Sequence, residues 1–335
     1  MKTRNTFMMW LLLSACWLMA GCSVIDDDLS DCNQGEEFHI DYQLRLITNM
    51  TTELQTQLTT VTEVGVADAL KVHLKDIFSD FAHDIDLSFY DTEGDLSVLE
   101  HKSDIMNANH TSYDLTLPMH KYMHLAVANI SDNAVVSLAD EKYSNTSMLR
   151  QSTGSTLASH GTGLFTARLP MEVLSGVSQT FYVKLYMANS AAALVVEPRG
   201  HTYKEMKVYA TGFASQFYIN DSTYVFDETP PLIKADKVDT GNDMLCYCSV
   251  NFPSRDNFSR AADDQSLWQF KIYLTKEDGK TTESVIYVRE PLKAGELKII
   301  KAAIDDDGGV RPTDSRVGVS VTLDWNSGGE YESEL

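Results

Sequence analysis

Basic residues are scarce in this sequence. Lys and Arg together number 27 against 48 Asp and Glu, and the formal net charge at pH 7 is −21. Binding to nucleic acid requires a basic face that neutralises phosphates, so no nucleic-acid partner is predicted. An acidic protein is also repelled by an anionic membrane surface, so attachment to a membrane must have another source.

Long hydrophobic runs are equally scarce, and the clearest one is short and N-terminal. It spans residues 7–19, follows Lys2 and Arg4, and precedes the small residues Ala20 and Gly21. A basic region, a short apolar region and small residues, in that order, form a secretory signal peptide. The run is too short for a resident transmembrane helix.

Cys22 directly follows these small residues, and the segment resembles a bacterial lipobox. In such proteins the signal is cut before the cysteine, and acyl chains such as palmitate hold the new N-terminus to a membrane. Met19 departs from the Leu that these boxes more often carry. The alternative is an ordinary signal peptide with a coincidental cysteine.

An acidic run, Asp26, Asp27 and Asp28, comes soon after this cysteine. Clustered like charges repel one another and bury nothing, so the run is not expected to fold locally. The plain interpretation is a solvated tether. The run also resembles the export signals that send lipoproteins of Bacteroides-like bacteria to the outer face of the outer membrane, and we expect this role.

The length of 335 residues exceeds one ordinary core, so two domains are expected. We predict a signal peptide (1–21), an acidic tether (22–37), an N-terminal β-sandwich (38–189) and a C-terminal β-sandwich (190–335). In the first domain, Ile40, Tyr42, Leu44 and Leu46 alternate with polar residues within a predicted strand from His39 to Met50.

Apolar residues at intervals of three and four between Val66 and Phe81 predict a helix that covers a sheet of the first domain. The following segments predict hairpins and strands as far as Met187. Residues 133–163 are polar and without period, and we predict a long surface loop there, with a helical turn near Leu138. Short strands at regular spacing predict that the second domain is a sandwich, closed by the alternating segment Val317–Trp325.

Two motifs invite a metal interpretation, and both have simpler ones. Cys246 and Cys248 fall on one side of a strand and are predicted to be small buried hydrophobes. Asp305-Asp306-Asp307-Gly308-Gly309 lacks the spaced ligands of an EF-hand, and we predict an acidic hairpin turn. No metal or cofactor is predicted.

Residue types that often act in catalysis are present, but they do not form a known catalytic motif. The nine histidines are scattered and none has HExxH spacing, and no GxSxG motif is present. His120 and His124 share one strand face, about 13 Å apart, too far to bind one ion. Gly161-Thr162-Gly163 is an isolated GxG and weak evidence for phosphate binding. We therefore expect a protein that is not an enzyme.

Two segments carry a resemblance to a known family. Cys22-Ser-Val-Ile-Asp-Asp-Asp-Leu-Ser-Asp-Cys32 resembles the mature start of the FimB/Mfa2 family, the anchor lipoproteins of Bacteroidales type V fimbriae. The closing segment Val317–Trp325, followed by Asn-Ser-Gly-Gly, is also typical of that family.

The resemblance implies two transthyretin-like sandwiches, lipidation at Cys22, and a non-catalytic role. Such a protein ties a fimbria to the outer membrane by contact with fimbrillin shaft subunits, and limits its length in some cases. The alternative, from another class, is a carbohydrate-binding surface lipoprotein, which exposed aromatic residues would support.

The resemblance also implies a constraint on assembly. Shaft subunits of this kind lose a first-domain strand to proteolysis and accept a neighbour's strand in the groove. An anchor that lost its N-terminal strand would lose its lipid. We therefore predict that the strand His39–Met50 stays in place, that Arg45 is a strand residue and not a processing site, and that the shaft contacts the second domain or an exposed strand edge.

Overall fold

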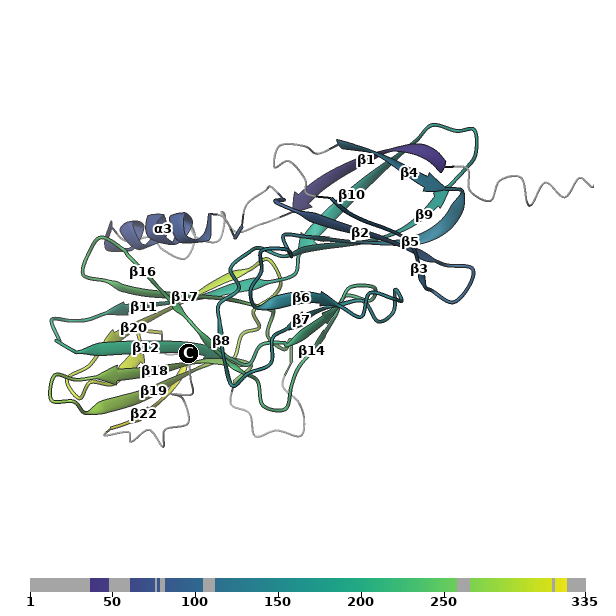
Figure 1. Cartoon of the computed structure of the whole chain (residues 1–335). Helices are drawn as coiled ribbons and strands as arrows, with labels where there is room; N and C mark the ends of the chain where they lie inside the picture. Colours follow the sequence, from purple (N-terminus) through teal and green to yellow (C-terminus); the bar gives the residue numbers. More distant parts are fainter. Residues whose placement is uncertain are drawn as a thin grey trace, which may run out of the picture.

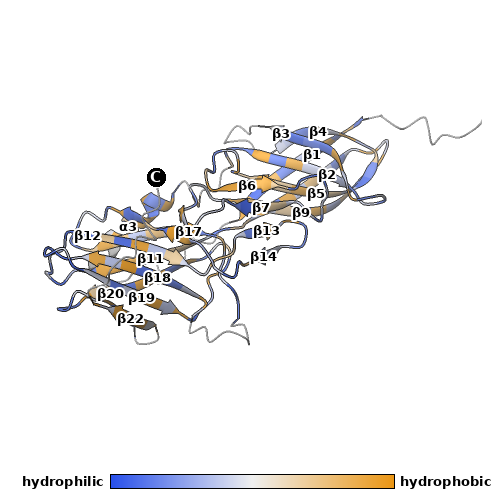
Figure 2. Ribbon diagram, turned by 60° about the horizontal axis from the view of Figure 1, so that its bottom comes forward, coloured by the Kyte–Doolittle hydropathy of each residue, from blue (hydrophilic) through white to orange (hydrophobic). Residues whose placement is uncertain are grey.

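The computed structural model describes residues 37–47, 61–75, 77–78, 82–104, 112–257, 266–314 and 317–323. Strands dominate, and they form two lobes with a small sheet between them (Figure 1). Apolar residues concentrate where the sheets face one another (Figure 2). The predicted fold class, mainly β with two sandwiches, is confirmed.

The first sandwich is one bent seven-stranded sheet of order β3-β2-β5-β9-β10-β1-β4. Its strands are β1 (Glu37–Ile47), β2 (Ile85–Asp91), β3 (Val98–Asp104), β4 (Ser112–Pro118), β5 (His120–Ala128), β9 (Phe165–Val173) and β10 (Gln179–Met187). β9 and β10 pair only where Tyr186 and Met187 meet Thr166 and Phe165. The sheet therefore folds at this joint into two layers, whose inner faces enclose one core.

The second sandwich packs a five-stranded sheet, β16-β17-β11-β20-β21, on a six-stranded sheet, β22-β19-β18-β12-β15-β8. The five-stranded sheet contains β11 (Ser190–Glu197), β16 (Asp236–Val238), β17 (Leu245–Asn251), β20 (Leu297–Ile304) and β21 (Val310–Pro312). The six-stranded sheet contains β8 (Thr156–Ala158), β12 (Glu205–Thr211), β15 (Leu232–Lys234), β18 (Trp268–Thr275), β19 (Thr281–Val288) and β22 (Gly318–Thr322).

The predicted helix is α3 (Val61–Leu74), and it covers the second sandwich, not the first. Val66, Leu70 and Leu74 pack on the outer face of the five-stranded sheet. Figure 1 shows α3 lying over this sheet. The expected placement in the first domain is thus wrong. A period of 3.6 shows that a helix has an apolar stripe but not which sheet receives it. The five-stranded sheet offers small residues there, among them Ala191 and Ala193, so the helix can approach closely.

A small sheet joins the lobes, and it corrects the prediction of a long loop at residues 133–163. Its order is β14-β13-β7-β6, with β6 (Val136–Ala139), β7 (Met148–Gln151), β13 (Gln216–Tyr218) and β14 (Thr223–Val225). β8 also lies in the predicted loop, and Leu138 is in a strand, not a helical turn. These strands have three or four residues each, too few to show a period in the sequence.

The small sheet packs on the outer face of the first sandwich. Leu125 and Val127 of β5 contact it from one side, and Phe217 of β13 and Phe252 belong to the same buried cluster. Tyr224 donates a hydrogen bond from its hydroxyl to the Ala188 carbonyl, at 2.7 Å. The chain passes from β10 to β11 between Met187 and Ser190, beside this cluster. The division of domains at residue 190 stays a prediction.

Candidate functional site: the N-terminal strand and its surroundings

The predicted lipidation residue Cys22, the predicted export signal Asp26, Asp27 and Asp28, and Cys32 lie outside the described residues. The first described element is β1, which begins at Glu37. None of the helices in the described part of the chain has the length and apolarity needed to cross a membrane. The structural part of the anchor hypothesis therefore depends on β1.

β1 is an interior strand of the first sandwich. It pairs in parallel with β10, from Ile40 opposite Gln179 to Ile47 opposite Tyr186, and antiparallel with β4 on its other side. Four side chains point into the core and are almost completely buried: Ile40, Tyr42, Leu44 and Leu46. Removing β1 would unpair both neighbours and open the core, so the strand fills its own groove.

A hydrogen bond ties β1 to the opposite layer of the sandwich. The Tyr42 hydroxyl lies 2.8 Å from His124 Nε2, and His124 Nδ1 lies 3.1 Å from the Ser88 carbonyl. A carbonyl only accepts, so Nδ1 carries the proton and Nε2 accepts from the Tyr42 hydroxyl. The imidazole is fully buried and stacks on Phe89 at 4.4 Å between ring centroids. Burial lowers the pKa of His124 to about 4, so the ring is neutral at pH 7.

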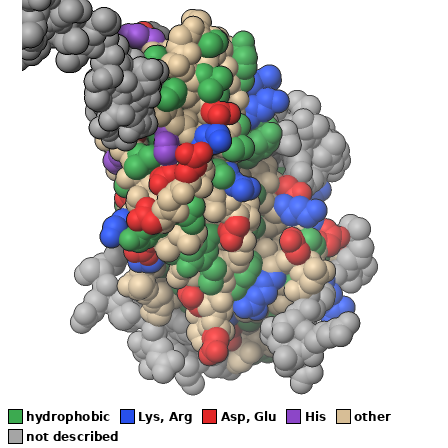
Figure 3. All heavy atoms as spheres, turned by 90° about the vertical axis from the view of Figure 1, so that its right-hand side faces the viewer, with side chains coloured by type: hydrophobic (Ala, Val, Ile, Leu, Met, Phe, Trp, Pro, Cys, Tyr) green, Lys and Arg blue, Asp and Glu red, His purple; other side chains and the backbone are tan. Residues whose placement is uncertain are grey.

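The outer face of the layer that contains β10 and β1 is polar and carries exposed aromatic residues. Tyr182 and Tyr186 of β10 point outward and are 70% and 57% exposed, with Lys184 between them. Arg45 of β1 pairs in register with Lys184 and is also exposed. Arg45 is thus a strand residue, as predicted. Figure 3 shows acidic, basic and hydrophobic side chains intermingled over the face it displays.

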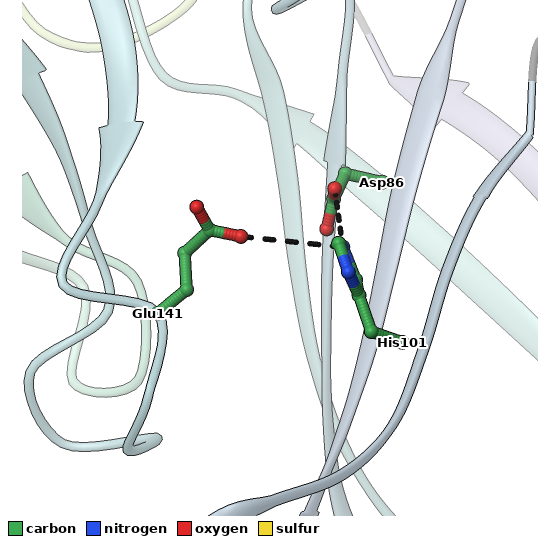
Figure 4. Close-up of side chains that lie close together, drawn as sticks. All are labelled: Asp86, His101 and Glu141. Atoms are coloured by element: carbon green, nitrogen blue, oxygen red, sulfur yellow. Dashed lines mark hydrogen bonds and ion pairs between the residues drawn. The ribbon is translucent and has the colours of Figure 1, made fainter.

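A second cluster lies on the far side of the first sandwich, at the rim of the small sheet (Figure 4). His101 Nε2 of β3 lies 2.6 Å from Asp86 Oδ2 of β2 and 4.0 Å from Glu141 Oε2. Glu141 comes from the connection between β6 and β7. Burial raises its pKa, and the negative charge of Asp86 adds to this effect, while His101 opposes it. Two carboxylates and an imidazole therefore share a small space.

His120 and His124 do not form a joint site. His120 pairs with Asp91 at 2.8 Å, while His124 faces Tyr42 in the core. His160 is fully buried beside Phe252, and burial lowers its pKa to about 3.

The two metal-like motifs have structural roles. Cys246 and Cys248 are both fully buried under α3, as predicted, and burial raises the pKa of Cys246 to about 12. The segment Asp305–Gly309 is the predicted turn, closed by a hydrogen bond from the Gly308 amide to the Asp305 carbonyl. Arg311 contacts Asp305 at 3.0 Å and Asp307 at 2.6 Å, which holds the pKa of the Asp307 carboxyl far below its usual range. The carboxylates of this turn are thus paired with a cation of the chain.

The Gly161-Thr162-Gly163 segment also serves the fold. The Thr162 hydroxyl donates to the Asn129 carbonyl, and the Asn189 amide donates to the Thr162 carbonyl. The Asn129 side-chain amide also donates to the Gly163 carbonyl, so the carbonyls of Thr162 and Gly163 both accept hydrogen bonds that hold the segment beside the ends of β5 and β10.

Sequence reasoning missed two of these features. Asp86, His101 and Glu141 are separated along the chain, and only the contact between β2, β3 and the small sheet brings them together. Tyr182 and Tyr186 carried a usable signal, since they alternate with the buried Val183 and Leu185 on one strand. That alternation predicts that the tyrosines face solvent.

Several solved structures are similar to this chain over most of its length. A candidate adhesin from Bacteroides thetaiotaomicron is 9% identical, with 87% of this chain and 99% of that chain covered and a TM-score of 0.50. The fimbrial anchor protein Mfa2 from Porphyromonas gingivalis is 12% identical, with 86% and 99% covered and a TM-score of 0.46. A candidate adhesin from Bacteroides ovatus is 14% identical, with 79% and 86% covered and a TM-score of 0.48. Comparison with curated proteins finds no match.

The fold is thus that of a solved candidate adhesin. A comparison with family models is more specific. The model of the fimbrillin-A associated anchor proteins Mfa1 and Mfa2 matches residues 60–327. The chain belongs to this family, which is a family of fimbria-associated proteins and not a known family of enzymes.

Proposed function

We propose that this protein anchors a fimbria to the outer membrane of its cell. Acyl chains on Cys22 hold the N-terminus in the membrane, and the folded part contacts fimbrillin shaft subunits. Asp26, Asp27 and Asp28 direct the protein to the outward face of the membrane. Membership of the anchor family supports the association with fimbrillin.

The observation that carries the proposal is the position of β1. An anchor must keep its N-terminal strand, because the lipid precedes that strand in the chain. β1 is paired on both edges and fills the core with Ile40, Tyr42, Leu44 and Leu46. A first domain complemented in this way has no free groove for a strand of a shaft subunit. The shaft contact is thus assigned to the second sandwich or to an exposed strand edge, such as β3 or β4.

The test is Cys22→Ala, compared with Cys248→Ala as a control that leaves the lipid site intact. Stable anchoring requires more than one acyl chain, at roughly 0.8 kcal/mol per buried CH₂, so the unacylated protein has too little affinity to remain. We expect Cys22→Ala to leave the membrane fraction after a carbonate wash and to shed fimbriae into the medium. Retention of both protein and fimbriae on the cells would contradict the proposal.

A second candidate function is carbohydrate binding, and the exposed pair Tyr182 and Tyr186 favours it. Aromatic rings on a flat strand face can stack on sugar rings while their hydroxyls stay in water. A glycan array separates the two functions. Binding of a glycan by the wild type that is lost in Tyr182→Ala/Tyr186→Ala supports the second candidate, and an array without binding removes it.

A further inference from the structure

Three donor groups of the kinds that bind transition-metal ions converge on the first sandwich. One donor atom each of Asp86, His101 and Glu141 lies within 4.8 Å of the other two. The close-up in Figure 4 shows both carboxylates facing the imidazole of His101. Among the residues that the structure describes, no other set of three such groups meets this way. The three residues belong to β2, β3 and the connection between β6 and β7, and none belongs to β1.

The backbone holds Glu141 in position from both sides. The Val98 amide donates to the Lys142 carbonyl, and the Ser144 amide donates to the Leu96 carbonyl, each at 3.0 Å. The connection that carries Glu141 therefore pairs with the segment leading into β3. A carboxylate from the small sheet is thus brought to an Asp–His pair of the first sandwich by fixed main-chain contacts, and a metal site needs such preorganisation.

A buried hydroxyl beside the cluster gives an independent sign of a polar ligand. Tyr90 of β2 is fully buried, and its hydroxyl has no hydrogen-bond partner among the described residues. Burial raises the pKa of this hydroxyl, and the nearby negative charges of Glu141 and Asp86 add to the effect. The neighbouring hydroxyls of Ser88 and Ser147 lower that pKa but do not complete a hydrogen bond. An unpaired buried donor is costly, and a water molecule on a bound cation would pair with it.

The charges and distances favour a small divalent cation. Two ionised carboxylates and a neutral imidazole sum to two negative charges, which such an ion neutralises. Zinc bonds to these donors measure about 2.0–2.2 Å, so tetrahedral donors lie about 3.3 Å apart. The separations of His101 Nε2 from Asp86 Oδ2, 2.6 Å, and from Glu141 Oε2, 4.0 Å, fall on either side of this value, and one donor atom of each of the three residues lies within 4.8 Å of the other two. Imidazole disfavours calcium and magnesium, which prefer oxygen ligands alone.

We propose that Asp86, His101 and Glu141 bind a divalent transition-metal ion of the Zn²⁺ type, with water as the fourth ligand. The ion links the first sandwich to the small sheet, and so it stiffens the joint between the two lobes.

The test is calorimetric titration of ZnCl₂ alone into chelator-treated, untagged full-length protein in detergent at pH 7. The variants are Glu141→Gln and His101→Gln. The control is His120→Gln, because His120 and Asp91 form a matched pair on the same sheet, 2.8 Å apart, with no second carboxylate in reach among the described residues. Thermal unfolding of each metal-free variant shows that it is folded.

We expect the wild type and His120→Gln to bind one Zn²⁺ in this site and to unfold at a higher temperature with the metal. Glu141→Gln and His101→Gln should bind at least tenfold more weakly and lose the thermal shift. A wild type that does not bind Zn²⁺ overturns the proposal. Binding that is equally tight in Glu141→Gln and His101→Gln also overturns it, because the metal then lies elsewhere.

Discussion

The most informative perturbation of stability is the replacement of His160 by Leu. This imidazole is fully buried, neither ring nitrogen has a hydrogen-bond partner among the described residues, and its pKa is lowered to about 3 from an ordinary value of 6.5. The folded protein therefore keeps His160 neutral, while the unfolded chain takes up a proton as the pH falls below 6.5. Stability is complete above that pH and is lost as the pH falls through the window from 6.5 to 3.

The size of the effect follows from proton linkage. Between pH 7 and pH 5, a site whose pKa changes from 3 to 6.5 on unfolding loses about 2 kcal/mol of unfolding free energy. His124, whose pKa is lowered by burial to about 4, contributes a loss of similar size in this range, so the wild type should lose about 4 kcal/mol in all, about half of it through His160. Leu is similar in size and carries no polar atom. His160→Leu should therefore be at least as stable as the wild type at pH 7 and should lose about 2 kcal/mol less than the wild type between pH 7 and pH 5.

The assay is denaturant unfolding at pH 7 and pH 5, followed by tryptophan fluorescence. Trp268 is buried in the core of the second sandwich, and His160 attaches to the same sandwich through its amide, which donates to the Val250 carbonyl at 3.0 Å. The control His201→Gln changes a histidine at the rim of this sandwich and should retain the wild-type loss. A loss in His160→Leu that equals the loss in the wild type would refute the reasoning.

Two further predictions concern export and the core around β1. Replacing Asp26, Asp27 and Asp28 with Ala should leave Cys22 acylated but trap the protein facing the periplasm. Cleavage of the protein by protease added to whole cells measures which way it faces. Cleavage equal to that of the wild type would show that the acidic residues are only a tether. Tyr42→Phe removes the donor to His124 Nε2 and leaves a buried acceptor unpaired, which should cost about 1–3 kcal/mol of unfolding free energy. Denaturant unfolding measures this cost, and an unchanged midpoint would show that the bond contributes nothing.

The individual strands could be predicted from the sequence, because burial of one face makes apolar and polar residues alternate with a period of two. β1 shows this in Ile40, Tyr42, Leu44 and Leu46, all of which are buried. The alternation in β22 misleads in one respect, since Val319 is 38% exposed and Leu323 just after it is 50% exposed. β22 is an edge strand, so a clear pattern in the sequence does not by itself measure depth.

Which elements pair or pack together could be predicted less well, because this depends on contacts between segments that are distant in the sequence. α3 precedes β2 in the chain but packs on the second sandwich. β8 lies before the crossing at Ser190, yet it pairs with β15 of the second sandwich. The cluster of Asp86, His101 and Glu141 could not be predicted for the same reason, because its members lie on three segments that are far apart in the sequence. The pattern of apolar and polar residues within one segment does not show which distant segment it will contact.

The central claim is that the mature protein keeps both its lipid and β1, and the N-terminus of the protein isolated from cells tests it most directly. Intact-mass and peptide mass spectrometry of the membrane fraction should find an acylated Cys22 as the first residue and peptides that cover Glu37–Ile47. A mature protein that begins after Arg45 would contradict the account, because it would have lost the lipid and the strand together.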